Sequence, residues 1–94
     1  MYAAIRRYAG VTEPAETGRR VNEEFVPLIR QIPGLLAYYW IDAGNGVMVS
    51  TSVFQDQAGA DESVSRAADF VRDNLASLLP NPPQVMAGEV VASA

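Results

Sequence analysis

The sequence predicts a single α+β domain of ferredoxin-like βαββαβ topology, with a four-stranded antiparallel sheet and two helices on one of its faces. Strand-like and helix-like patterns follow one another in the order strand, helix, strand, strand, helix, strand. A turn containing Asn45-Gly46, a strong hairpin signal, joins the two central strands. No repeat or break in composition divides residues 1–94, so we expect one domain over the whole sequence.

The first half of the sequence predicts one strand and one helix. Residues 2–8 are rich in aromatic and β-compatible side chains, which favours a strand. A helix then begins at Pro14, because proline suits a first helical turn, and ends at Pro33-Gly34. Pro27 predicts a kink inside this helix, because an interior proline removes a backbone hydrogen bond. The apolar face consists of Val21, Phe25, Leu28, Ile29 and Ile32.

The second half predicts a hairpin, a helix and a last strand. Residues 35–41 are a dense apolar and aromatic run, and residues 47–54 form its β-branched return strand. Asp56 can cap a second helix, which the proline-rich residues 80–83 end. Residues 85–91 then form the fourth strand. The apolar face of this helix consists of Ala60, Val64, Ala67, Ala68, Val71, Leu75 and Leu78.

Both faces of the predicted sheet are largely apolar. In residues 35–41 and 47–54 apolar side chains occupy odd and even positions alike. Two helices can cover only one face, so the other face needs a partner, since large exposed apolar patches mark interaction surfaces. We therefore expect a homodimer whose two sheets pack face to face.

The number of residues in the hairpin loop decides which side chains of the two central strands share a face. An even number places Tyr38 and Trp40 on the same side as Thr51, and Tyr39 beside Ser50. An odd number, which a bulged turn produces, reverses this match. The sequence leaves both alternatives open.

The composition excludes several kinds of chemistry. The chain has no cysteine and no histidine, which excludes disulfides, thiolate catalysis, a Ser-His-Asp triad and histidine-ligated metal or haem. We expect no metal site and no cofactor. The net charge of −4 and the lack of a basic stripe argue against nucleic-acid binding. No run is long and apolar enough for a membrane span and no signal-type segment opens the sequence, so we expect a cytoplasmic protein.

Three short stretches carry a resemblance to a known family. They are residues 32–38, with Pro33-Gly34 before a strand; the hairpin at residues 44–46; and residues 52–56, which lead into an alanine-rich helix. Together they resemble the antibiotic biosynthesis monooxygenase-like group of the dimeric α/β-barrel superfamily. The resemblance implies a dimer and a pocket between each sheet and its own helices. Some members of that group oxidise polycyclic aromatic substrates without a cofactor, some degrade haem, and many have no known role.

The sequence differs from the catalytic pattern of that family at two positions. Family oxygenases often have a Trp-x-Asp pattern at the end of the third strand, with an Asn four residues before the Trp. Here Phe54 precedes Gln55-Asp56, and Ser50 stands at the position of the Asn. Haem-degrading relatives need a histidine, which this sequence lacks. The catalytic residues are therefore unassigned, and the sequence does not decide whether the protein is an enzyme.

Candidate pocket residues lie on the central strands. Tyr39, Ser50, Ser52 and Phe54 could line a pocket for a flat ligand, because rings stack and hydroxyls supply polar contacts. The alternative for the aromatic residues is packing into the core and the dimer interface, which strands favour in any case. The alternative for the serines is that their small size lets a helix approach the sheet.

Two arginines and one asparagine complete the candidates. Arg6 and Arg7 lie on opposite faces of the first strand, so one of them points to a buried side, where a guanidinium could hold a carboxylate or enolate. The alternative, which we favour, is an ion pair with Glu89 on the last strand. Asn22, on the first helix, could donate to a ligand oxygen or be a solvated helix residue.

The leading functional hypothesis is a small-molecule-binding domain that acts as a cofactor-independent monooxygenase on an aromatic or polyketide-like substrate. It follows mainly from the resemblance. The alternative is a non-catalytic, dimeric binding or stress-associated module. A lyase or isomerase on the same fold is a third hypothesis, which the lack of histidine weakens.

Overall fold

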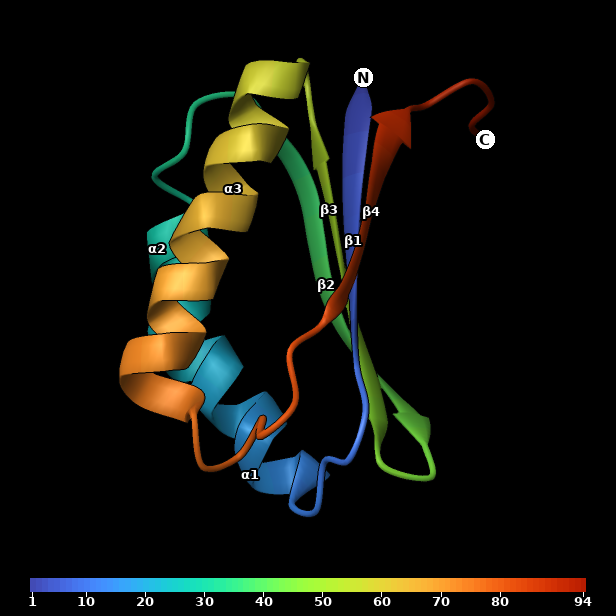
Figure 1. Cartoon of the computed structure of the whole chain (residues 1–94). Helices are drawn as coiled ribbons and strands as arrows, with labels where there is room; N and C mark the ends of the chain where they lie inside the picture. The colour runs from blue at the N-terminus through green and yellow to red at the C-terminus, as the bar shows by residue number, and fades with distance from the viewer.

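The computed structural model describes residues 1–94 and has two layers, a sheet and a helical layer on one of its faces (Figure 1). The sheet is antiparallel throughout, with the strand order β2-β3-β1-β4. Its strands are β1 (Tyr2–Tyr8), β2 (Leu35–Gly44), β3 (Val47–Phe54) and β4 (Gln84–Glu89). The predicted α+β ferredoxin-like fold is confirmed, and both outer strands end within three residues of their predicted bounds.

Each of the two helical segments contains a π-helical part. The first consists of α1 (Pro14–Arg20), η1 (Val21–Phe25) and α2 (Val26–Ile29), and the second of α3 (Gln57–Phe70) and η2 (Val71–Leu75). Pro27, where the sequence predicts a kink, is the second residue of α2, which follows η1 directly. No helix is long and apolar enough to span a bilayer. Short π-helical parts are often found at functional sites, and both parts here face the same region of the core.

The hydrophobic core fills the space between the two layers. Phe25 of η1 lies at its centre, with its ring centroid 5.7 Å from that of Tyr38 and 5.2 Å from that of Phe70. Asp56 caps α3 as predicted, because its side chain accepts a hydrogen bond from the backbone N–H of Gly59 at 3.1 Å. One end of this core, beside β4, is open to a pocket.

A bulge in β2 decides which side chains face the helices. The register of β2 against β3 shifts between Asp42 and Gly44, next to a turn in which Gly44, Asn45 and Gly46 all have positive φ. As a result Tyr38 pairs with Ser52, and Trp40 lies opposite Ser50 on the helix-facing side. The structure therefore has the match of faces expected for an odd number of loop residues, which is one of the two alternatives that the sequence left open.

The other face of the sheet carries no helices (Figure 1). Tyr39, Thr51, Ile5 and Met86 form a row across all four strands of this outer face. Tyr39 is 62% exposed and Met86 is 67% exposed. Three of the four residues of this row, Tyr39, Ile5 and Met86, are large hydrophobic side chains that are exposed within the chain, as expected for an apolar outer face.

Candidate functional site

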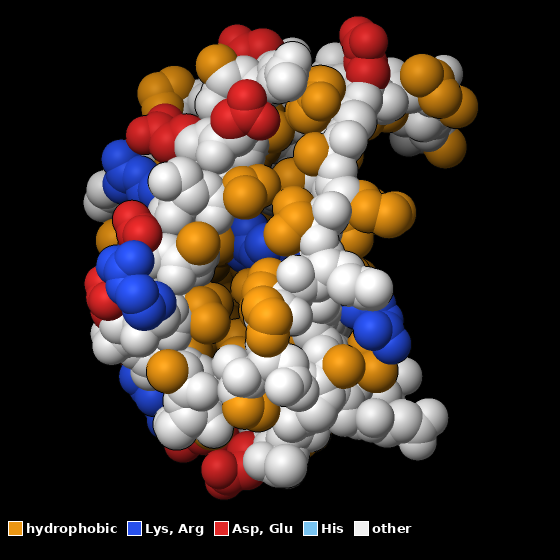
Figure 2. All heavy atoms as spheres, in the orientation of Figure 1, with side chains coloured by type: hydrophobic (Ala, Val, Ile, Leu, Met, Phe, Trp, Pro, Cys, Tyr) orange, Lys and Arg blue, Asp and Glu red, His pale blue; other side chains and the backbone are white.

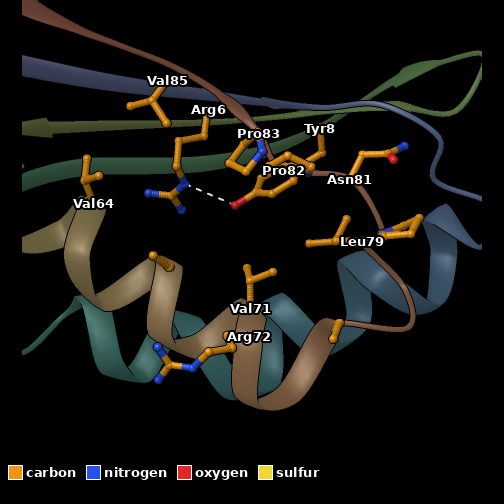
Figure 3. A pocket seen from close by; sticks show the side chains of 13 residues that line it. Arg6, Tyr8, Val64, Val71, Arg72, Leu79, Asn81, Pro82, Pro83 and Val85 are labelled. Carbon is orange, nitrogen blue, oxygen red and sulfur yellow. Dashed lines mark hydrogen bonds between the residues drawn. The ribbon is translucent and has the colours of Figure 1, made fainter.

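A pocket of about 290 Å³ opens between the second helical segment and β4. Figure 2 shows the hollow, with hydrophobic side chains around it and a basic side chain at its floor. It lies where the connector after η2 leaves the helical layer and crosses to the sheet (Figure 3). It is lined by Arg6, Tyr8, Val64, Ala68, Val71, Arg72, Ala76, Leu79, Pro80, Asn81, Pro82, Pro83 and Val85. Its size is near the lower end of the range for small-molecule sites.

Arg6 is the basic residue at the inner wall of this pocket. Strand alternation turns Arg6 of β1 toward the helices and Arg7 toward the outer face, and Arg6 is only 4% exposed. Its Nε donates a hydrogen bond to the hydroxyl oxygen of Tyr8 at 3.2 Å (Figure 3). Its two terminal nitrogens have no protein acceptor, and Arg6 forms no ion pair. A buried guanidinium without a carboxylate partner is unusual.

The expected ion pair between Arg6 and Glu89 does not form. Val85, and not Glu89, lies opposite Arg6, whereas Glu89 lies opposite Tyr2 near the other end of β1. These two positions are four residues apart along β4, which corresponds to about 13 Å at the usual rise of a strand. The side chains therefore cannot meet, and the positive charge of Arg6 is left facing the pocket.

A second, much smaller cavity lies on the other side of Arg6. It has a volume of about 10 Å³, roughly the space of one water molecule, and Arg6 and Val71 line both cavities. Tyr38 and Trp40 also line it, and the hydroxyl of Tyr38 and the indole N–H of Trp40 are buried with no hydrogen-bond partner. Burial raises the pKa of Tyr38 far above its usual range, and the nearby charge of Arg6 opposes this shift only in part.

Both π-helical parts contribute walls to the small cavity. Val21 and Phe25 come from η1, and Val71 and Leu75 come from η2. A π-helical turn shifts the residues that follow it around the helix axis, so it changes which side chains point at the sheet. The helical side of the small cavity is therefore aliphatic and aromatic. Its polar groups come from the sheet.

Comparison with known proteins gives structural matches. No family model matches the sequence, and no curated protein matches it. A protein of unknown function from Nitrosomonas europaea superposes with a TM-score of 0.80 at 21% identity, over 99% of this chain and 91% of that chain. SnoaB, a cofactor-independent oxygenase from Streptomyces nogalater, has a TM-score of 0.73 at 12% identity, over 98% of this chain and 94% of that chain. A monooxygenase of Streptomyces coelicolor, solved with the ligand nanaomycin D, has a TM-score of 0.68 at 16% identity, over 98% of this chain and 92% of that chain.

The matches span nearly the full length of both partners, and further ones are antibiotic biosynthesis monooxygenases by name. The chain has the antibiotic biosynthesis monooxygenase fold. The resemblance stated from the sequence is thus confirmed at the level of the fold. At these identities a shared fold says nothing about substrate or activity, which have to be argued from the site itself.

Within the antibiotic biosynthesis monooxygenase fold, the predicted site residues separate into four groups. Arg6 lines the pocket, and it is the only one of the seven candidates to do so. Arg7 and Tyr39 lie on the outer face. Of the two arginines, Arg7 is thus the one that is not buried, whereas the expected place of Tyr39 in the pocket is corrected, because the bulge turned Tyr39 away. Asn22 is exposed on η1, and it lines a separate pocket of about 250 Å³ together with Tyr39.

The remaining candidates lie in the core. Ser50, Ser52 and Phe54 face the helices but do not line the pocket. The hydroxyl of Ser52 donates to the carbonyl oxygen of Ala4 at 3.4 Å, and Phe54 is completely buried against Gly59. The alternative interpretation, that the serines leave room for close packing, is the one that this arrangement favours.

Apart from Arg6, the residues that line the pocket were not among the candidates from the sequence. Tyr8, Val71 and Leu79 line it together with Pro82 and Val85 on the connector and β4. The alternation of β1 already placed Tyr8 on the same face as Arg6, so that residue could have been found. The connector could not, because nothing local to a proline-rich segment tells which surface it will cross.

Proposed function

We propose that this protein binds a small, flat and largely apolar molecule in the pocket beside β4 and acts on it as a cofactor-independent monooxygenase, with an aromatic or polyketide-like substrate. The observation that carries the proposal is the 290 Å³ pocket with apolar walls and a single buried guanidinium. Apolar walls favour an aromatic ring, and one charged donor orients it. The pocket lies between the sheet and its own helices, where the resemblance leads us to expect it.

The chemistry asks for groups that this pocket can supply. Oxygenation without a cofactor needs an electron-rich substrate whose anion is stabilised in a site that excludes water. The guanidinium of Arg6 can stabilise such an anion, and the hydroxyl of Tyr8, which already accepts from Arg6, can donate to a substrate oxygen. SnoaB, with the same fold, is a cofactor-independent oxygenase, which supports the choice of this reaction class.

Filling the pocket is expected to abolish ligand binding. Flat polycyclic phenols, haem and small aromatic acids are screened by thermal shift, since a ligand at a hundredfold excess over Kd stabilises the native state by about 2.7 kcal/mol. For a domain of this size the melting temperature then rises by roughly 10 °C or more. Ala68→Trp, which fills the pocket from α3, should remove the shift.

Ser65→Trp is the matched control, because Ser65 is also exposed on α3 but does not line the pocket. It should keep the ligand-induced shift. A shift that survives Ala68→Trp would place the ligand elsewhere and overturn the proposed site. Oxygen consumption with the ligand that binds then tests the monooxygenase reaction.

A non-catalytic, dimeric binding module is the second candidate function. Phe54, at the position where related oxygenases often have Trp, is fully buried in the core and cannot touch a ligand in the pocket. A protein that uses this pocket only to bind a ligand would need no catalytic side chain from position 54 in the pocket. Tight binding without any oxygen consumption, across every ligand that gives a thermal shift, would favour this second candidate.

We further propose that the protein is a homodimer in which two outer sheet faces pack together. A stable interface buries on the order of 800 Å² per partner, and the outer face, with Ile5 near its centre, is an unpartnered apolar surface. Ile5→Glu should weaken the dimer at least a hundredfold, because the interface would bury an unpaired carboxylate. Light scattering over a dilution series measures the effect.

Leu28→Glu is the matched control for the dimer. Ile5 and Leu28 are both 37% exposed within one chain, but Leu28 lies in α2 on the helical layer. The control should leave the dimer intact. A wild-type protein that is a folded monomer at micromolar concentration would contradict the proposal directly.

A further inference from the structure

The burial of Arg6 is unfavourable for the stability of the fold. Its neighbours on the inner face of the sheet are Val85 of β4 and Ser50 of β3, and it makes one hydrogen bond, to Tyr8. Removing a charge from water without a compensating partner is unfavourable, and an apolar residue would fit this helix-covered position better. Such a residue is expected where a function requires it.

The surroundings of Arg6 contain no negative charge. No Asp or Glu lines the pocket or the small cavity. Arg72, the other arginine at the pocket, is already paired with Asp69 and Asp73 at 3.2 Å and 3.0 Å. In a chain of net charge −4, the only uncompensated charge that faces either cavity is therefore positive.

Hydrogen-bond donors accumulate around the same point. Arg6 has free N–H groups on its terminal nitrogens, and the buried N–H of Trp40 and hydroxyl of Tyr38 both lack a partner. Trp40 can only donate, and Tyr38 can donate through its O–H. The orphan donors of Tyr38 and Trp40 line the small cavity, which has the size of one water molecule, whereas Arg6 also lines the pocket. Buried donors are normally satisfied, so the free N–H groups of Arg6 point to an acceptor that arrives with a ligand in the pocket.

We propose that the ligand of this pocket carries an oxyanion, either a carboxylate or an ionised phenol or enol, which binds to the guanidinium of Arg6. The proposal rests on the proposed function in one respect, that the pocket is a binding site. The apolar walls hold the ring or hydrocarbon part of the ligand, and its oxyanion occupies the side toward Arg6, where two parallel N–H···O bonds can form. Because Arg6 is the only uncompensated charge that faces the pocket, we expect a ligand with one oxyanion group and not with several.

An acid and its methyl ester test this proposal, because they share a shape and differ in charge. Wild-type protein is titrated with 2-naphthoate and with methyl 2-naphthoate, and binding is followed by calorimetry and by the fluorescence of Trp40, the single tryptophan. The acid should bind at least tenfold more tightly than the ester. In Arg6→Met this preference should vanish, and the affinity for the ester should change less than threefold.

Arg7→Met is the matched control, since Arg7 follows Arg6 in the chain but lies on the outer face. It should keep the tenfold preference for the acid. Equal affinity of acid and ester for the wild type would rule out a carboxylate site while leaving the pocket intact. Loss of binding of both compounds in Ala68→Trp but not in Arg6→Met confirms the pocket independently, and no binding of either compound to the wild type overturns both proposals.

A phenol that ionises near neutral pH distinguishes the two sources of the oxyanion. 4-Nitrophenol becomes yellow when it ionises, so its absorbance shows directly which form is bound. If the site accepts phenolates, the wild type should shift the ionisation of bound 4-nitrophenol to lower pH, and Arg6→Met should not. If 2-naphthoate binds with the expected preference and 4-nitrophenol shows no shift, the site is one for carboxylates. If neither shows a dependence on Arg6, the proposal is wrong.

Discussion

Phe25→Ala is expected to destabilise the protein by about 3–5 kcal/mol, the usual cost of removing a buried phenylalanine ring. Phe25 is 2% exposed and its ring lies between those of Tyr38 and Phe70, so the substitution removes contacts to the sheet and to the second helical segment together. Because a small domain has only about 5–15 kcal/mol of stability in total, this loss is a large part of it. Urea unfolding at a fixed protein concentration, followed by circular dichroism, measures the change.

Leu28→Ala is the control for this substitution. Leu28 lies three residues further along the same helical layer but is exposed, so its truncation should cost well under 1 kcal/mol. A loss below about 1.5 kcal/mol in Phe25→Ala would mean that the core collapses around the missing ring. Phe25 also lines the small cavity beside Arg6, and its loss should enlarge that cavity and admit water to the orphan donors.

Gly59→Ala is expected to destabilise the protein by about 2 kcal/mol, although alanine is the better helix former. Gly59 is the third residue of α3, and a Cβ there would lie 2.7 Å from Cδ1 of Phe54 and 3.2 Å from the carbonyl oxygen of Pro33. Phe54 has no free space to move into, since it is 0% exposed. The steric cost therefore exceeds the gain in helix propensity. Thermal unfolding should show the melting temperature falling by roughly 10 °C.

Gly18→Ala is the matched control, a glycine-to-alanine change inside α1. Its Cβ would lie 3.9 Å from Cδ1 of Trp40, an ordinary contact, so only the helix propensity acts. This variant should gain about 0.5–1 kcal/mol. If both variants are stabilised, Phe54 can move away from α3, and the close approach of helix and sheet at Gly59 is not a constraint.

The parts of the site that the sequence predicted are those that depend on alternation within one strand. Neighbouring residues of β1 point to opposite faces, so the sequence shows that only one of Arg6 and Arg7 can be buried. Which one it is, and what it meets, depends on the neighbouring strands. The register of β4 places Val85 opposite Arg6 and takes Glu89 out of reach, which leaves the guanidinium unpaired.

The error over Tyr39 has a simple physical cause. Side chains of a strand repeat every two residues, so one additional residue at the turn exchanges its faces relative to its partner. The shift between Asp42 and Gly44 did this, and it brought Tyr38 and Trp40 to the inner face instead of Tyr39. The sequence contains the glycines that permit such a bulge, but glycine is also compatible with a regular two-residue turn.

The sequence by itself determined the order of the elements, the fold class and the exclusion of cysteine and histidine chemistry, because composition and periodicity are local properties of a chain. Only the tertiary structure decided the site. Its walls come from β1, the second helical segment and the connector to β4, which are far apart in the sequence, with Arg6, Val71 and Pro82 as examples. Which residues meet across that distance depends on a bulge, two π-helical turns and the path of a proline-rich connector, and each of these is settled by the packing of the whole domain.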